Sequence, residues 1–196
     1  MSDRTDAPDP TVGDDLAGIA QLTAGEVRGF LDAVTEVASG TSSATALPVL
    51  LLATSQVLVT GARLGAIGDV LPAERFEPDP GPDADVEPVR VGLANLLEGL
   101  DEYVDVEDPM TSGEIERGSL SGDLAEIAVA LVHGLRHYES GRVDESLWWW
   151  QFSYLSSWGE RGACALRVLL SVLSHLRLDA DEDIVADAEF EALHQA

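Results

Sequence analysis

The sequence predicts an all-α fold, a single-domain helical bundle of five to seven helices with a disordered acidic N-terminal tail. Apolar residues recur three and four positions apart in several segments, as in helices that bury one face. Strand-like alternation is hard to find, and glycine and proline punctuate the chain without forming a repeat. With 196 residues and 45% hydrophobic content, the chain is long enough for one domain that buries roughly 70% of its unfolded surface.

The core is expected to form around the segment from Leu147 to Leu176, which contains all four tryptophans. On a helical wheel this segment separates into two apolar stripes and one polar wedge, which predicts a helix packed against two neighbours. Gly159 and Gly162 each cost up to about 1 kcal/mol inside a helix. Either the chain breaks near Gly159, or another part of the protein approaches closely there. The stripes are Trp148, Phe152, Leu155, Gly162, Ala163, Leu166, Leu170 and Leu173, and Tyr154, Trp158, Ala165, Leu169, Val172 and Leu176.

Trp149 falls in the polar wedge of this wheel, beside serines and charged residues. A tryptophan ring can bury about 150 to 250 Å², so something is expected to cover it. The candidates are the acidic proline-rich loop from Gly65 to Asp85, the C-terminal segment, or another molecule.

The same segment carries a family resemblance. The order Trp150-Gln151-Phe152, then Tyr154, the pair Trp158-Gly159 and the run Ala165-Leu166-Arg167 resembles domain-of-unknown-function family 5063, a group of small bacterial helical proteins. The resemblance implies a helical fold and supplies no activity. Ser157 and Leu170 stand where histidines often occur in that family, so the resemblance implies no histidine-based chemistry at these positions.

Composition restricts the possible partners. The formal net charge is −25, with eleven arginines and no lysine, which disfavours nucleic-acid binding through a basic patch and fits either a halophile or a GC-rich genome. The single Cys164 excludes an internal disulfide and fits a reducing cytoplasm. No export signal is recognisable at the N-terminus, and the apolar run Leu47 to Val59 is short for the roughly 20 residues of a membrane span. We expect a cytoplasmic protein with no cofactor and no membrane contact.

The N-terminal half is divided as follows. Residues 1–20 are expected to form a mobile acidic tail, because they contain too little apolar surface to offset ordering. The helical domain, residues 21–178, begins with a helix whose capping box is Thr23 and Glu26. A second helix over Ala44 to Arg63 is apolar nearly all round, which predicts a position in the bundle centre.

The second half begins with a Pro/Asp-rich loop over residues 65–86. Pro88 opens a helix with Leu93, Leu97 and Tyr103 on its apolar side, and Ser121 is expected to cap a helix that Gly141 ends. Asp144 is the expected cap of the tryptophan helix. Residues 179–196 form an acidic segment in which 181–193 fits a short terminal helix.

Two groups of residues have metal-ligand spacing. Glu98, Asp101, Glu102 and Asp105 would share one face of a helix, as carboxylates do at divalent-metal sites and, superficially, in all-α nucleotide pyrophosphatases. A solvated acidic face explains the same pattern in a chain with 36 acidic residues. His133 and His137 are one helical turn apart, but they are expected on the polar side of their helix, and no third ligand is identifiable.

The remaining candidates are single residues. Cys164 has no recognisable base nearby, so a packing role is expected rather than a nucleophilic one. Arg161 and Arg167 could hold anions, although ion pairing is the usual state of arginines in an acidic chain.

Two classes of function remain. The first is a non-enzymatic interaction or adaptor module that binds a protein partner or self-associates through aromatic and arginine residues, because such residues often dominate interfaces. The second is a small-ligand-binding or divalent-metal-dependent enzyme that uses the same stripe together with the acidic helix face. The expected partner or ligand surface comprises Trp149, Gln151, Tyr154, Trp158, Arg161 and Arg167.

Overall fold

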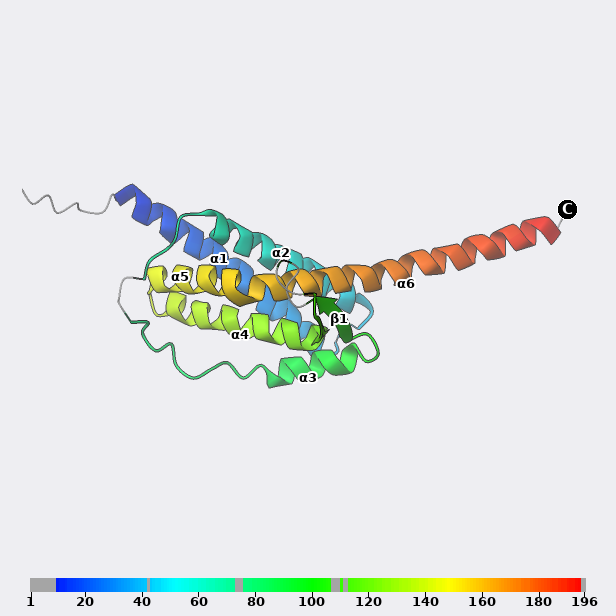
Figure 1. Cartoon of the computed structure of the whole chain (residues 1–196), viewed down its shortest axis with the longest axis horizontal. Coiled ribbons are helices and arrows are strands. Elements are labelled where there is room, and N and C mark those ends of the chain that lie inside the picture. Colours follow the sequence, from blue (N-terminus) through cyan, green and yellow to red (C-terminus); the bar gives the residue numbers. More distant parts are fainter. Residues whose placement is uncertain (1–9, 42, 73–75, 107–109, 111–112, 195–196) are drawn as a thin grey trace, which may run out of the picture.

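The computed structural model describes residues 10–41, 43–72, 76–106, 110 and 113–194. It is a mainly helical single domain with one small two-stranded sheet, which confirms the predicted fold class (Figure 1). Residues 1–9 of the expected tail lie outside the described part.

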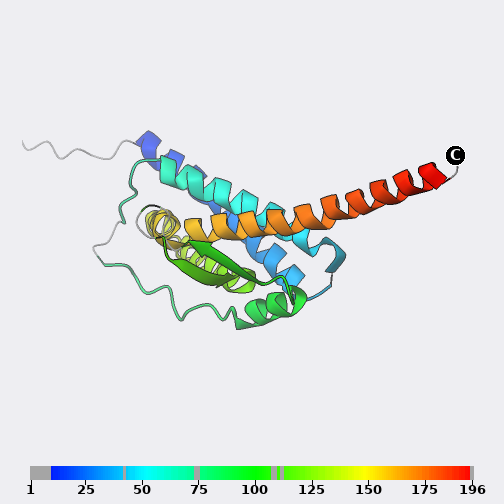
Figure 2. The same cartoon turned by 45° about the vertical axis from the view of Figure 1, so that its right-hand side comes forward.

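Helices from both halves of the chain pack together into one bundle. Helix α1 packs on α2, α3 and α4, while α5 and the first part of α6 lie against α2 and α4. Figures 1 and 2 show the second part of α6 extending beyond the bundle. The elements are α1 (Pro10–Ala38), the 3₁₀ turn η1 (Ser43–Thr45), α2 (Ala46–Ala66), α3 (Glu87–Leu96), β1 (Glu102–Val106), β2 (Ile115–Ser119), α4 (Leu120–Glu139), α5 (Val143–Ser153), the π-helix η2 (Tyr154–Trp158) and α6 (Gly159–His194).

Helix α1 begins at Pro10, well before the capping box predicted at Thr23. Proline suits the first turn of a helix, where its missing N–H would have no partner. The apolar spacing also continues upstream of Thr23, because Leu16, Ile19 and Ala20 pack on the core. Thr23 is buried in the middle of the helix, so residues 16–20 belong to the bundle rather than to a tail.

Helix α2 lies at the edge of the bundle and not, as predicted, at its centre. Leu50, Val57 and Leu64 are buried, whereas Leu52 and Val59 are 62% and 51% exposed. A helix with apolar residues nearly all round can therefore still expose one face to solvent. By length and composition the segment Ser43–Ala66 is also apolar enough to cross a membrane, and 39% of its 18-residue apolar window is buried in the bundle.

The chain from Leu97 to Ser119 differs most from the prediction, because a β-hairpin replaces a continued helix. Gly99 adopts a positive φ of 82°, a conformation that ends α3 and that glycine adopts without strain. Strand β1 then pairs antiparallel with β2. The sequence EYVDV does alternate, with Tyr103 and Asp105 half-buried between exposed neighbours, and this short alternation was missed.

Helix α4 ends where predicted, at Gly141 with φ of 80°, but its cap is different. Ser119 Oγ accepts the N–H of Gly122 at 3.2 Å, while Ser121 bonds to Asp101 instead. Asp144 does not cap α5, because it lies inside the first turn and Arg142 occupies the cap position without a side-chain bond.

The tryptophan segment is helical without interruption from Val143 to His194 through α5, η2 and α6. Gly159 keeps helical torsion angles, φ −63° and ψ −45°, so the chain does not break there. Close packing explains the second glycine, since a Cβ on Gly162 would lie 2.9 Å from Leu58 of α2. The acidic segment 181–193 is helical, as part of α6 rather than as a separate helix.

The π-helix changes which residues of this segment are buried. A π-turn accommodates an extra residue and rotates everything that follows relative to an uninterrupted α-helix. Trp158, Ala165 and Leu169 of the second predicted stripe are buried. Three members of the first stripe are more than half exposed: Phe152, Leu155 and Leu170.

This register predicts different effects for two adjacent leucines. Leu169→Ala should lower the free energy of unfolding by about 2 to 5 kcal/mol, because Leu169 is completely buried and its truncation leaves a cavity. Leu170→Ala is the control, with an expected loss of about 0.5 kcal/mol because that side chain is 54% exposed. Urea denaturation followed by circular dichroism measures both, and equal losses would contradict the register.

Candidate functional site

A polar pocket of about 420 Å³ lies between the β-hairpin, the N-terminal end of α4 and the junction of η2 with α6. Its walls carry carboxylates, guanidinium groups, hydroxyls and one thiol. We call it the hairpin pocket, and its lining residues are Tyr103, Asp105, Val106, Glu116, Arg117, Gly118, Asp123, Ser156, Ser157, Glu160, Arg161 and Cys164.

A buried carboxylate stands at the centre of the hairpin pocket. Asp123 of α4 is 6% exposed, and its two oxygens accept hydrogen bonds from the Tyr103 hydroxyl and from Arg161 at 3.1 Å. Tyr103 reaches across its own hairpin to make this contact. It does so because its cross-strand partner is Gly118, where a Cβ would stand 2.5 Å from the tyrosine ring.

Burial changes the protonation behaviour of these groups. Burial raises the pKa of Asp123 above its usual value, although the bonds from Tyr103 and Arg161 act in the opposite direction. Burial, together with the hydrogen bond to Asp123, also raises the pKa of Tyr103. The Tyr103 hydroxyl therefore stays protonated at neutral pH and donates its hydrogen bond to Asp123.

A second carboxylate organises the side of the hairpin pocket that faces α6. Asp105 of β1 accepts from Arg167 at 2.5 Å. Burial, followed by the hydrogen bond with Asp105, raises the pKa of Cys164 to about 12. Because the thiolate is the reactive form, a raised pKa makes this cysteine a weaker nucleophile at neutral pH.

The structure divides the predicted partner surface. Arg161 lines the hairpin pocket, and Arg167 is ion-paired beside it. Tyr154 is half-buried, whereas Trp158 and Gln151 are only 1% and 5% exposed. These six residues therefore do not form one exposed face.

Gln151 is buried because its side chain makes hydrogen bonds to the backbone. Its amide Nε2 donates to the carbonyls of Leu64 and Gly68, and its Oε1 accepts the N–H of Val70. The side chain thus satisfies backbone groups where α2 ends and the long loop begins. No periodic pattern distinguishes such a residue from the edge of a polar wedge.

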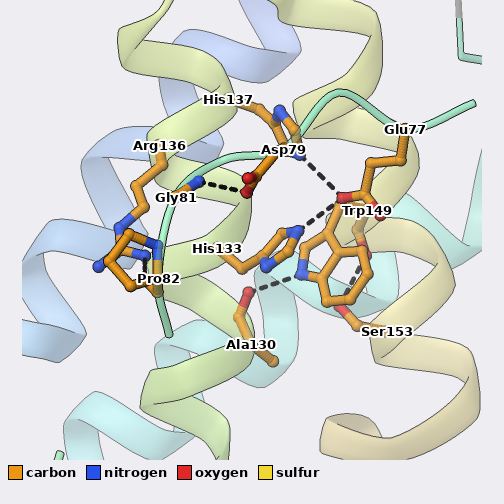
Figure 3. Close-up of polar contacts among 10 residues, drawn as sticks. All are labelled: Glu77, Asp79, Gly81, Pro82, Ala130, His133, Arg136, His137, Trp149 and Ser153. Carbon is orange, nitrogen blue, oxygen red and sulfur yellow. Dashed lines mark hydrogen bonds and ion pairs between the residues drawn. The ribbon is translucent and has the colours of Figure 1, made fainter. Parts of the chain in front are cut away.

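Trp149 is half-buried and covered within the chain. Its indole Nε1 donates to the Ala130 carbonyl of α4 at 2.9 Å, and its ring stacks on His133 at a centroid separation of 3.8 Å. Helix α4 was not among the three expected covers. The predicted loop contributes indirectly, since Figure 3 shows its residue Glu77 reaching the histidine on which Trp149 stacks.

The four carboxylates predicted on one helix face are dispersed, because the helix ends before them. Glu98 and Glu102 are exposed. Asp101 accepts the N–H and hydroxyl of Ser121, each at 2.7 Å, at the start of α4, and Asp105 enters the hairpin pocket. The acidic-face metal site and the likeness to nucleotide pyrophosphatases therefore lose their structural basis.

The two histidines of α4 meet a third potential ligand from the long loop. Both Nε2 atoms approach Oε1 of Glu77, His133 at 2.5 Å and His137 at 2.9 Å (Figure 3). His137 is completely buried rather than on the polar side of the helix. Burial raises the pKa of Glu77, but the bonds with both histidines outweigh it and lower the pKa below its usual value.

We call these three residues the Glu-His-His cluster. Their ligand atoms lie within 4.8 Å of one another. The sequence did not identify Glu77 because 36 acidic residues offer many candidates, and only the path of the loop selects one.

Comparison with known proteins then assigns the chain to a family. The profile of a domain of unknown function, DUF5063, matches residues 14–175. The chain belongs to this family. The DUF5063 match contains the helical bundle, the hairpin pocket and the Glu-His-His cluster, and it confirms the resemblance noted in the tryptophan segment.

A solved structure supports the fold of this DUF5063 domain. The crystal structure of protein BF1032 from Bacteroides fragilis has a TM-score of 0.57 and 17% sequence identity, and the alignment covers 80% of this chain and 89% of that one. At this identity the likeness concerns the fold alone. A search of curated proteins found no match.

The contacts of Trp149 predict a structural effect of its removal. Trp149→Ala should lower the free energy of unfolding by about 1 to 3 kcal/mol, through the lost ring contacts and the unpartnered Ala130 carbonyl. Leu155→Ala, at a side chain that is 66% exposed, is the control and should lose about 0.5 kcal/mol. Chemical denaturation measures both variants, and an unchanged stability of Trp149→Ala would contradict the intramolecular cover.

Proposed function

We propose that this DUF5063 domain binds a small, polar, amine-bearing molecule in the hairpin pocket. One observation carries the proposal: four titratable groups with displaced pKa values line this single pocket, namely Tyr103, Asp105, Asp123 and Cys164. Such groups concentrate at functional sites, because binding and catalysis require charges and donors held in unusual surroundings.

The charge of the hairpin pocket supports a cationic or zwitterionic ligand. Four carboxylates (Asp105, Glu116, Asp123 and Glu160) line it against two guanidinium groups (Arg117 and Arg161). A concave surface of predominantly negative charge concentrates cations and repels polyanions. The volume of about 420 Å³ is within the range of small-molecule sites, roughly 300 to 1,000 Å³.

The backbone provides a further argument. The π-helix η2 supplies Ser156 and Ser157 to the pocket wall. π-turns are rare and often occur at functional sites, because they reposition side chains that an α-helix would point elsewhere. In this protein the π-turn itself forms part of the pocket wall.

The same groups favour binding over catalysis. The Cys164 thiol, with a pKa of about 12, is protonated at neutral pH and is a weak nucleophile. Both oxygens of Asp123 already accept hydrogen bonds, from Tyr103 and Arg161. The protein is therefore proposed as a ligand-binding module.

A thermal-shift panel of putrescine, arginine, citrate and ATP tests the ligand class. Putrescine or arginine should raise the melting temperature, because a ligand that binds only the folded state stabilises it by mass action. Citrate and ATP should have no effect. The double variant Glu116→Gln with Glu160→Gln should abolish the shift while leaving the fold intact, since both side chains are exposed at the pocket rim.

The matched control is Glu98→Gln with Glu126→Gln, which removes the same charge from exposed positions outside the pocket. This control should retain the shift. Stabilisation by citrate or ATP alone, or an equal loss in both double variants, would contradict a site for amines in the hairpin pocket.

A second candidate function, binding of a protein partner, rests on a different observation. Phe152, Leu155 and Leu170 are 52%, 66% and 54% exposed on one long helix, and Phe152 stacks on Trp148 at 5.7 Å. Exposed aromatic and aliphatic side chains are typical of interaction surfaces. We call these three residues the apolar row, and we propose them in place of the mixed surface expected from the sequence.

Self-association through the apolar row is testable without an identified partner. Sedimentation velocity should detect dimers at micromolar concentration, and Phe152→Ser with Leu155→Ser should return the protein to monomer. Leu52→Ser with Val59→Ser, at exposed positions of α2, is the control and should leave the dimer unchanged. A monomeric wild-type protein would contradict self-association.

A further inference from the structure

We propose that the Glu-His-His cluster binds one Zn²⁺ ion and thereby fastens the long loop between α2 and α3 to helix α4. The cluster is separate from the hairpin pocket: none of its three residues lines that pocket. Along α4, Asp123 and His133 are ten residues apart, roughly 15 Å of helix.

The three ligand atoms already converge on one point. His133 Nε2 and His137 Nε2 lie 2.5 and 2.9 Å from the same oxygen of Glu77. Tetrahedral Zn²⁺ with bonds of about 2.0 to 2.2 Å separates its ligand atoms by roughly 3.3 Å. A small outward movement of the Glu77 side chain, which is 27% exposed on an extended loop, makes room for the ion.

The donor set selects the metal. Two imidazole nitrogens and one carboxylate oxygen suit Zn²⁺, with a water molecule as the fourth ligand. Mg²⁺ and Ca²⁺ prefer sites made of oxygen donors. The spacing of His133 and His137, four residues on one helix, brings both rings to the same side of α4.

The rings are held by neighbours before any ion binds. The His133 ring stacks on Trp149, which is itself hydrogen-bonded to α4, and His137 is completely buried. Such preorganisation reduces the ordering cost of binding. His137 Nδ1 is buried without a hydrogen-bond partner among the described residues. When Nε2 binds the metal, Nδ1 carries the ring proton. The free energy of the metal bond must then offset the cost of burying this N–H group.

The site would add a metal-mediated attachment to the hydrogen bonds that already hold the described parts of the loop. Gln151 holds the loop at Val70, and Arg136 donates to the carbonyl of Pro82. Glu77 lies between these two contacts. A metal bound there would join the middle of the loop to α4.

Isothermal titration of the metal-free, tag-free protein with ZnCl₂ tests the proposal. We expect one equivalent of Zn²⁺ to bind and to raise the melting temperature, whereas MgCl₂ does neither. Glu77→Gln should weaken Zn²⁺ binding by at least about tenfold, as loss of metal-site partners does. Asp83→Asn removes the same charge from an exposed position of the same loop and should keep the affinity within about twofold of wild type.

Co²⁺ provides an independent readout, because its visible absorption intensifies in tetrahedral nitrogen and oxygen coordination. The wild-type and Asp83→Asn proteins should show this absorption, and Glu77→Gln should not. Absence of stoichiometric Zn²⁺ binding, or equal weakening in both variants, would overturn the site. In that case Glu77 and the histidines would form a hydrogen-bonded contact only.

Discussion

The contact between α4 and α5 is the constraint on which most of the structure depends. Two successive tryptophans donate their indole N–H groups to two successive carbonyls of α4: Trp149 to Ala130 at 2.9 Å and Trp150 to Leu131 at 3.1 Å. Each bond contributes about 1 kcal/mol, less than the burial of the rings. Together they fix both the rotation and the axial position of α5, because a shift by one residue would break both.

This fixed position determines what the loop can reach. With α5 in place, Gln151 faces the end of α2 and holds the first residues of the loop. Trp149 is placed against His133, so the histidine ring is oriented toward the loop rather than into solvent. The Glu-His-His cluster therefore depends on the same pair of helices that carries the core, although two of its residues come from α4 and the third from the loop.

The sequence was informative where periodicity is long. The helical class, the end of α4 at Gly141 and the burial of Trp158 and Leu169 follow from patterns that extend over several turns. The hairpin was missed because five residues of alternation between glycines resemble the continuation of α3. The partners of Glu77, Asp123 and Gln151 were inaccessible for a different reason: their contacts join positions 20 to 87 residues apart, and only the tertiary path of the chain brings them together.

The π-helix reconciles two demands that a regular helix could not meet at once. Before it, the indoles of Trp149 and Trp150 must face α4; after it, Ala165 and Leu169 are buried where α6 packs on α2 and α4. Each residue of an α-helix turns the next by about 100°, so one extra residue in a turn is a large correction. Ser153 shows how the turn is stabilised, since its hydroxyl donates to the Trp149 carbonyl and accepts the Trp158 indole. The side chains that the widened turn exposes, Ser156 and Ser157, line the hairpin pocket, so the register of the core and the composition of the pocket have the same origin.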